Sequence, residues 1–334
     1  MKTFGTFFWS MMGMLVFVFS ACQSGRDIPA WVEEAPLEAD YYVGIGWAEK
    51  TAGEDGCRQQ AENMALDQIT EDIVAASSGA VSDEVLDQAG IDRVTFFEHF
   101  TLKTRERIED FEYEKVEEYE SEGEFWAFYR LSMEEYGNKL DEMIQAARDN
   151  SWEYYQHSEE LMFEGDLSMS LAYALRAAGE IAPYWGMGIS APDEERREKL
   201  DALVRDHLHN LLRGMRLRAI PNTLELHVEE APEVPIGIEV QYSGIATEIR
   251  PVKELPLAVE VEENVMEYSP PQPTNLQGES RLEIGVVLKE GYHEVNILPD
   301  VKRMGDLHQE TLSAPLFQSV TIPYARLMLR VSGY

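Results

Sequence analysis

The spacing of the hydrophobic residues changes twice along this chain of 334 residues, and this change limits the fold more than any other feature. Strand-like and helix-like spacings alternate from Pro29 to about Asn150, and helical spacing follows from Ser151 to about Arg218. A period of two then runs from Asn222 to Tyr334. We therefore predict a multidomain α+β protein with an α+β domain at 29–150, a helical region at 151–218 and a β-sandwich at 222–334.

Strands and helices alternate in the first region. A strand is expected at Tyr41–Trp47, with glycines that allow another backbone to approach closely, and a helix with small alanines follows at 61–76. Further strands are expected at three stretches: 96–107, 108–119 and 124–131. Ser132 and Glu135 form a capping box that starts a second helix. The order β-α-β-β-β-α predicts a small α+β sandwich with helices on one face of its sheet.

The middle region predicts a helical hairpin followed by a long helix. Helices at 152–163 and 167–181 are joined by Gly165-Asp166, and the second one stops at Pro183. This order is similar to one tetratricopeptide repeat, and no second copy follows. A third helix is expected from about Pro192 to Arg218. Three arginines near its end suit the negative end of the helix dipole: Arg213, Arg216 and Arg218.

The last third alternates between hydrophobic and polar residues. About seven short strands are expected, at 224–228, 236–242, 257–261, 282–288, 295–297, 320–322 and 327–331. Turns bearing proline and glycine separate them, and Pro270–Pro273 is the longest loop signal. The pattern predicts an antiparallel β-sandwich of immunoglobulin-like size at 222–334.

The N-terminus is typical of a secretory signal. Lys2 is the only charged residue before Arg26, and the 18 residues of Phe4–Ala21 are all apolar or small. The segment closes with Phe19-Ser20-Ala21-Cys22, which resembles the lipobox of bacterial lipoproteins, where small residues precede the cysteine that receives diacylglycerol. The resemblance implies a lipoprotein signal peptide at 1–21, cleavage before Cys22, and lipid, including palmitate, on that cysteine.

The alternative for this segment is a transmembrane anchor, because 18 such residues are long enough to span a bilayer. No basic cluster follows in the linker at 22–28 to hold such an anchor in place, so the lipoprotein is favoured. Gln23 stands where some bacteria use aspartate to retain lipoproteins at the inner membrane. By that resemblance we expect the outer membrane.

A family resemblance begins directly after the linker. Pro29-Ala30-Trp31-Val32, then Tyr42-Val43-Gly44-Ile45-Gly46, lead into an alanine-rich helix carrying Arg58, Ala61, Ala65 and Ile69. Together these residues resemble the LPP-twenty family of small bacterial envelope lipoproteins, over about residues 29–150. The resemblance implies an envelope location and a structural or assembly role. It carries over no catalytic residues, and the chain has some 180 residues beyond it.

Charge excludes some partners. The formal net charge is −34, and loss of Lys2 with the signal peptide would make it −35. Such a chain repels the phosphates of nucleic acid and does not favour lying flat on an anionic membrane.

The cysteine count excludes a disulfide within the chain. Only two cysteines occur, so lipid on Cys22 leaves Cys57 without a disulfide partner. We expect Cys57 to be a small buried residue on a helix.

No motif points to an enzyme, a metal or a cofactor. His207 and His209 are two residues apart on a predicted helix, so their side chains point in different directions and cannot share a metal. Acidic pairs such as Asp110 with Glu112, or Glu117 with Glu118, could serve a glycosidase, but 62 acidic residues produce such pairs by chance. We expect no enzyme, no cofactor and no metal site.

Two functions follow. The first is a non-enzymatic envelope lipoprotein that docks other proteins, with a membrane bound through Cys22 and an envelope protein complex as partners; homo-oligomerisation stays open. The alternative is a module on the β-sandwich that binds glycan or peptidoglycan. Aromatic residues cluster at 41–47, 125–129 and 152–155, and we expect these rings to serve the core more often than a carbohydrate surface.

Overall fold

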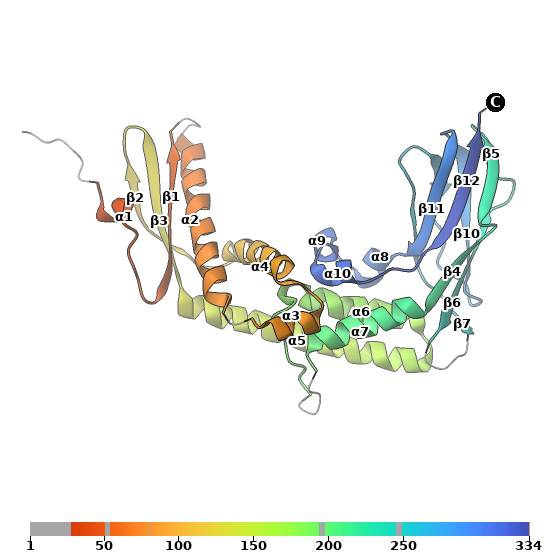
Figure 1. The fold of residues 1–334 in the computed structure, drawn as a ribbon, viewed down its shortest axis with the longest axis horizontal. Helices are drawn as coiled ribbons and strands as arrows, with labels where there is room; N and C mark the ends of the chain where they lie inside the picture. The colour runs from red at the N-terminus through yellow and green to blue at the C-terminus, as the bar shows by residue number, and fades with distance from the viewer. Residues whose placement is uncertain (1–27, 51–53, 80, 194–197, 245–248, 334) are drawn as a thin grey trace, which may run out of the picture.

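The computed structural model describes residues 28–50, 54–79, 81–193, 198–244 and 249–333. The predicted signal peptide, Cys22 and most of the linker at 22–28 lie outside the described residues. In Figure 1 the described chain forms an open U. A β-containing arm stands at each end of a helical base, and this arrangement confirms the multidomain α+β class. None of the described helices combines the length and the apolar composition needed to cross a membrane.

The N-terminal arm is a three-stranded antiparallel sheet covered by a helix. The strands are β1 (Tyr41–Glu49), β2 (Glu114–Glu120) and β3 (Glu124–Ser132), and their order in the sheet is β1-β3-β2. Helix α2 (Glu54–Ser77) packs on one face of the sheet, and the short α1 (Ala30–Glu33) packs on the other through Trp31.

Two glycines let α2 lie unusually close to β1. A Cβ atom on Gly44 would lie 2.0 Å from the carbonyl oxygen of Ala65, and one on Gly46 would lie 1.8 Å from that of Ala61. Both alanines are fully buried. The close backbone approach expected from the strand glycines and the small alanines is confirmed.

The predicted strand at 96–107 is wrong, because this stretch lies within helix α4 (Arg93–Ile108). The Asp92 side chain caps α4 by accepting hydrogen bonds from the backbone N–H groups of Val94 and Thr95, at 3.0 and 3.1 Å. Residues four apart are buried along one face of this helix: Phe96, Phe100, Thr104 and Ile108. Phenylalanine and threonine favour strands, which explains the wrong prediction. The Asp92 cap and the four-residue spacing of the buried side chains favour a helix instead.

Two further differences change the order of the N-terminal elements. Helix α3 (Asp83–Ala89) fills a stretch for which no element was predicted, and β2 begins only at Glu114, not at 108. Among the described residues the order is therefore α-β-α-α-α-β-β-α instead of β-α-β-β-β-α. The strand predicted at 124–131 is confirmed as β3.

The base is built on one long helix. Helix α5 (Met133–Glu164) has 32 residues and starts at the predicted cap, where Ser132 Oγ accepts a hydrogen bond from the backbone N–H of Glu135 at 3.2 Å. The predicted boundary between residues 150 and 151 therefore lies inside a continuous helix. Gly165 ends α5 in a left-handed conformation, and Asp166 caps α6 (Leu167–Ile181), so the predicted helical hairpin is confirmed.

A short 3-10 turn, η1 (Ala182–Tyr184), follows α6, and α7 (Leu200–Gly214) completes the base. The helix predicted from about Pro192 to Arg218 was placed too long at both ends. Pro192 and Asp193 are not helical and α7 begins at Leu200, while residues 215–220 form a strand in which buried and more exposed positions alternate. Arg213 lies in the last turn of α7, whereas Arg216 and Arg218 lie on that strand, so the helix-dipole explanation fails for these two.

The C-terminal arm consists of two packed sheets. One contains β4 (Met215–Ile220), β6 (Ile236–Ser243), β10 (Glu279–Val287) and β9 (Met266–Ser269) in that order, with β7 (Ile249–Pro251) paired to β6. The other contains β5 (Thr223–His227), β12 (Ala325–Ser332), β11 (Gly291–Pro299) and β8 (Leu257–Glu260). The predicted sandwich is present, but it is not wholly antiparallel, because β5 and β12 run parallel.

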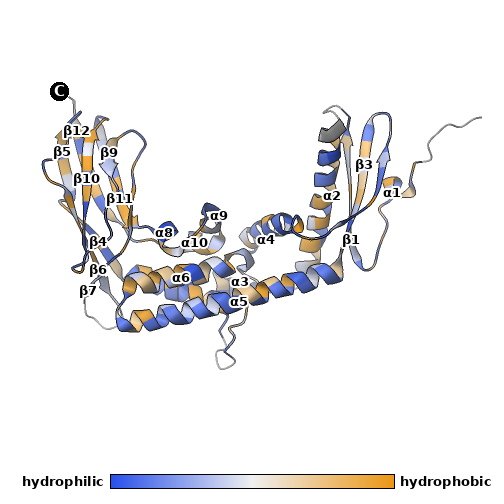
Figure 2. Ribbon diagram, turned by 180° about the vertical axis from the view of Figure 1, so that it is seen from behind, coloured by the Kyte–Doolittle hydropathy of each residue, from blue (hydrophilic) through white to orange (hydrophobic). Residues whose placement is uncertain are grey.

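The strand predicted at 320–322 is absent from the described sheets. Three short helices instead connect β11 to β12: α8 (Val301–Gly305), α9 (Gln309–Leu312) and α10 (Pro315–Ser319). They lie between the C-terminal arm and the base (Figures 1 and 2). Gly305 lies against Leu175 of α6, and Leu307 lies against Gly179 of the same helix, so this connection packs on the base.

The hydrophobic core is divided unequally. The inner face of the N-terminal sheet and α2 form one cluster of buried residues. A second and larger cluster runs without a break from α3 and α4 through the base into the sandwich. The base and the C-terminal arm therefore share a core, whereas the N-terminal sheet has its own.

The α2–β1 contact predicts a large effect of one methyl group. Gly46→Ala should lower the free energy of unfolding by about 3 kcal/mol or more, because a Cβ at this position overlaps the backbone of α2. Gly137→Ala, in α5, is the control: a Cβ there has no neighbour within 4 Å, so the change should stabilise the chain by about 0.5–1 kcal/mol. Urea denaturation followed by circular dichroism measures both. Equal stabilities of the two variants would contradict the close packing.

Candidate functional site

The site residue named from the sequence, Cys22, lies outside the described residues, and its lipidation stays a prediction. Cys57 is buried on α2, as expected. Within the described ranges, no group of three or more histidine, cysteine, aspartate or glutamate side chains is placed to hold a metal ion.

His207 is a core residue of α7. Its Nε2 atom lies 2.7 Å from Ser158 Oγ of α5, and its ring packs edge-on against Tyr155. Burial lowers the pKa of His207, and the nearby Glu159 opposes that shift. His209, two residues on, is only half-buried, so the two side chains diverge as predicted.

The Ser158–His207 pair has the length of a nucleophile–base contact, but its hydrogen bonds give it a different role. Ser158 Oγ donates to the carbonyl oxygen of Ser170 at 2.6 Å, and Ser170 Oγ donates back to that of Ser158 at 2.8 Å. Because the Ser158 proton is used in this way, His207 Nε2 carries a proton and donates to Ser158 Oγ. Both serines are fully buried, so the cluster joins helices and cannot receive a substrate.

The acidic pairs considered for glycosidase chemistry are exposed. Asp110 and Glu112 lie in the turn between α4 and β2, and Glu117 and Glu118 lie on β2. Glu117 accepts a hydrogen bond from the indole of Trp31 at 2.8 Å, and Glu118 forms an ion pair with Lys115 at 2.7 Å. These carboxylates belong to a solvated surface.

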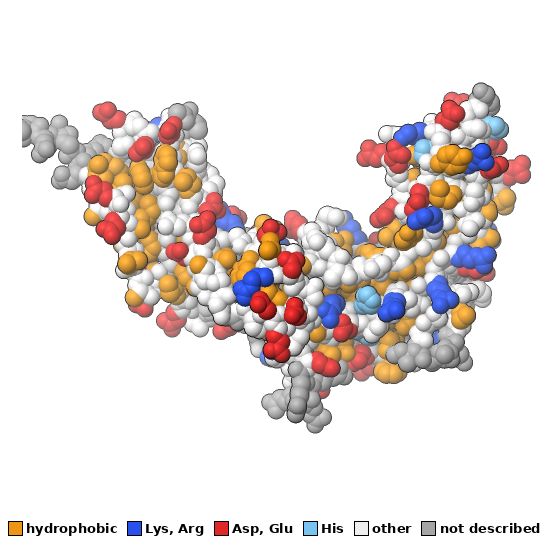
Figure 3. Space-filling view, in the orientation of Figure 1, with side chains coloured by type: hydrophobic (Ala, Val, Ile, Leu, Met, Phe, Trp, Pro, Cys, Tyr) orange, Lys and Arg blue, Asp and Glu red, His pale blue; other side chains and the backbone are white. Residues whose placement is uncertain are grey.

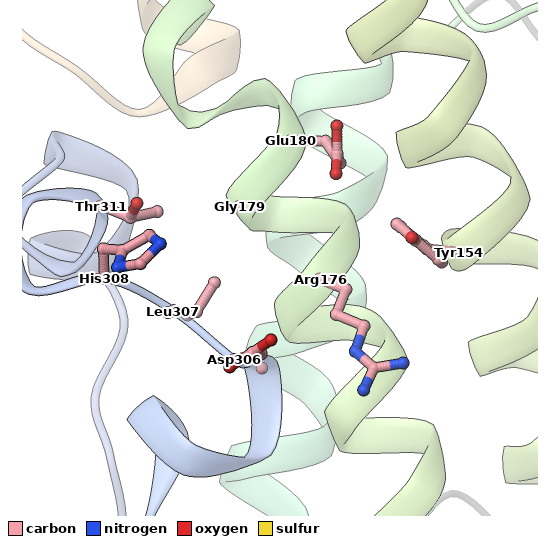
Figure 4. A pocket seen from close by; sticks show the side chains of 9 residues that line it. Tyr154, Arg176, Gly179, Glu180, Asp306, Leu307, His308 and Thr311 are labelled. Carbon is pink, nitrogen blue, oxygen red and sulfur yellow. The ribbon is translucent and has the colours of Figure 1, made fainter.

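A polar cleft of about 340 Å³ lies where the connection from α8 to α9 crosses α6. In Figure 4, His308 and Thr311 lie on one side of α6 and Tyr154 lies on the other. Arg176 is held over the ring of Tyr173 at 5.3 Å. The polar groups thus do not converge on one point, and the cleft offers scattered contacts instead of a reaction centre.

An apolar pocket of about 380 Å³ lies beside this connection. Leu175, Leu208 and Leu212 of the base line it, together with Leu312 and Phe317 of the short helices. Its size is at the lower end of the range for small-molecule sites. Such a pocket can hold a small apolar group.

Helix α4 carries an apolar stripe between the arms, formed by Val94, Phe97 and Leu102. Val94 is 67% exposed, Leu102 is 55% exposed, and Phe97 is half-buried beside them. Arg93 and Arg105 border the stripe, and hydrophobic and basic side chains lie together over α4 in Figure 3. An exposed apolar patch with charged borders suits contact with another protein.

The aromatic clusters seen in the sequence divide between core and surface. Tyr42, Phe125 and Tyr129 belong to the core between the N-terminal sheet and α2, as expected. Trp47 and Trp126 lie on the opposite face, with ring centroids 6.0 Å apart. The sequence alone could not separate the two sets, because the separation depends on the register of β1 against β3.

The C-terminal sandwich, where the sequence placed an alternative glycan site, has no aromatic row among its described residues. Its exposed tyrosines lie on separate segments: Tyr268 on β9, Tyr292 on β11 and Tyr324 just before β12. The third cluster, with Trp152 and Tyr155, packs within the base.

Comparison of this chain with protein-family models, with curated proteins and with solved structures finds no match.

The buried His207 predicts a pH dependence. Because its pKa is lowered in the folded chain, the unfolded chain takes up a proton first as the pH falls. Stability from the neutral ring is thus complete above about pH 6.5 and is lost below it. Urea denaturation between pH 7.5 and 5.5 measures the free energy of unfolding of the wild type and of His207→Gln. The difference between the two should shrink as the pH falls. His209→Gln is the control for loss of a histidine. A difference in unfolding free energy between the wild type and His207→Gln that stays constant with pH would contradict the prediction.

Proposed function

We propose that this chain is a non-enzymatic lipoprotein of the bacterial cell envelope that docks another envelope protein at the surface between its arms. The observation that carries the proposal is the position of the α4 stripe: exposed apolar side chains lie between two β-containing arms that the continuous α5 connects. A partner there can touch the stripe and both arms together.

The anchor is the lipid proposed for Cys22. The described chain begins at Ile28, six residues later, and an extended segment of that length reaches about 20 Å. The N-terminal arm would therefore be held close to the membrane surface. The resemblance to the LPP-twenty family supports a location in the cell envelope, and the Gln23 that follows the cysteine supports the outer membrane.

The chemistry of the described residues supports a role without catalysis. The Ser158–His207 pair is closed off inside the base and has its protons committed to structural bonds. The polar groups of the cleft in Figure 4 lie on both sides of α6. The acidic surface favours a soluble, self-repelling molecule that meets partners through limited apolar patches.

Lipidation is tested in growing cells with a fatty-acid analogue. We expect label on the wild-type chain and none on Cys22→Ala, because the thiol of Cys22 is the proposed attachment point. Cys57→Ala is the matched control and should keep the label, since Cys57 is buried on α2. Label on Cys22→Ala at the wild-type level would contradict the anchor.

Docking is tested with charged substitutions in the stripe. We expect the wild type to form a high-mass complex on native gels of membrane fractions. Val94→Glu together with Leu102→Glu should reduce this complex by about tenfold or more, because a partner would have to bury two carboxylates. Val234→Glu is the control, since this valine is 71% exposed on the C-terminal arm. Unchanged circular dichroism verifies folding. A complex that survives the double substitution would contradict docking at α4.

A further inference from the structure

The outer face of the N-terminal sheet carries three aromatic rings in register. Trp47 of β1 lies directly opposite Trp126 of β3, and Tyr119 of β2 lies opposite Trp126 from the other side. Residues directly opposite each other in a ladder project from the same face of the sheet. The three rings therefore form one row across three strands, about 10 Å from the first strand to the last. We call Trp47, Trp126 and Tyr119 the aromatic row.

The position of α2 shows why these rings are not core residues. The alternate residues of β1, including Gly44 and Gly46, face α2, so Trp47 points away from it. Trp47 is 38% exposed, and Trp126 and Tyr119 are half-buried. Two tryptophans and a tyrosine thus remain at a surface although core positions exist on the other face.

Among the described residues, helix α1 covers the neighbouring part of the same face, where Trp126 and Tyr119 pack beside it and Trp47 stays exposed. The ring of Trp31 packs against Phe128 with centroids 5.8 Å apart, and its indole N–H donates to Glu117. Phe128 and Trp31 are buried by this contact. The row lies further along the strands, toward the turn at 121–123 that joins β2 to β3.

Carboxylates border the row. Glu124 accepts a hydrogen bond from the indole N–H of Trp126 at 3.1 Å, and Glu49 lies opposite Glu124 in the ladder. A carboxylate has about four acceptor positions, so one indole bond leaves Glu124 able to accept more.

These features select a class of ligand. The acidic border repels nucleic acid and anionic lipid. A neutral sugar chain complements it, because each sugar ring offers an apolar C–H face for an aromatic ring and hydroxyl or amide N–H groups for a carboxylate. A row spread across three strands suits an extended chain better than a compact molecule.

We propose that the aromatic row binds a neutral glycan strand, with Trp47, Trp126 and Tyr119 stacking on successive sugars and Glu124 accepting their hydrogen bonds. This glycan site lies on the N-terminal sheet instead of the C-terminal sandwich. It is separate from the α4 stripe and does not depend on docking there.

The test uses the full chain in detergent and calorimetric titration with two soluble probes, oligosaccharides of N-acetylglucosamine and of glucose. We expect saturable binding of at least one, weakened about tenfold by Trp47→Ala. Trp47→Phe retains a ring and should keep most of the affinity. Tyr292→Ala is the matched control, since this tyrosine is exposed on the C-terminal arm and should not affect binding.

Two results would overturn the proposal. One is no saturable binding of either oligosaccharide, or binding that Trp47→Ala leaves unchanged. The other is association of the chain with zwitterionic phosphatidylcholine vesicles that depends on Trp47, without oligosaccharide binding, which would make the row a membrane-interface contact. Near-ultraviolet circular dichroism of each variant verifies that the sheet remains folded.

Discussion

The close pairing of α5 with α6 is the contact on which the rest of the structure depends. Small side chains bring the two helices together, and serine hydroxyls donate across the gap: Ser158 and Ser170 exchange bonds with each other's carbonyl oxygens, and Ser151 donates to that of Ala177 at 2.8 Å. Buried hydroxyls are costly unless bonded, so the helices are held in one register. Both arms are attached to this pair, because β3 leads into α5 and β4 continues from α7, which packs on α6.

A second set of polar contacts fixes helix α4, which packs on α2 of the N-terminal arm, to the base. Arg107 of α4 donates to the carbonyl oxygen of Pro183 at 2.6 Å and lies over the ring of Tyr184, while His99 Nε2 lies 3.0 Å from the carbonyl oxygen of Ala182. Burial lowers the pKa of Arg107 and of His99. Helix α4 is thus fixed to η1 by its inner face, which leaves its apolar stripe on the outer one.

The spacing of hydrophobic residues predicted the helices and strands whose ends are marked by local features such as caps. It failed where contacts with residues distant in sequence determine the secondary structure. The caps at Ser132 and Asp166 located the helices of the base. Residues 215–220 leave the helix because they pair with β6, a partner distant in sequence. Ser170 donates to the carbonyl oxygen of Ser158, a contact between helices that hydrophobic spacing does not indicate. The aromatic clusters were visible in the sequence, but only the ladder register places Trp47, Trp126 and Tyr119 in one row.

The continuous α5 also restricts which insertions and deletions the chain can tolerate. Thirty-two helical residues span about 48 Å, so the helix sets the separation of the arms. Inserting one residue in the stretch before the α6 contact would turn one arm by about 100° relative to the other and shift it by about 1.5 Å. Insertions of seven residues, close to two full turns, would nearly preserve the relative orientation and add about 10 Å. Tolerated length variation in this helix should therefore come in whole turns, whereas the exposed turn at 121–123 is under no such restriction.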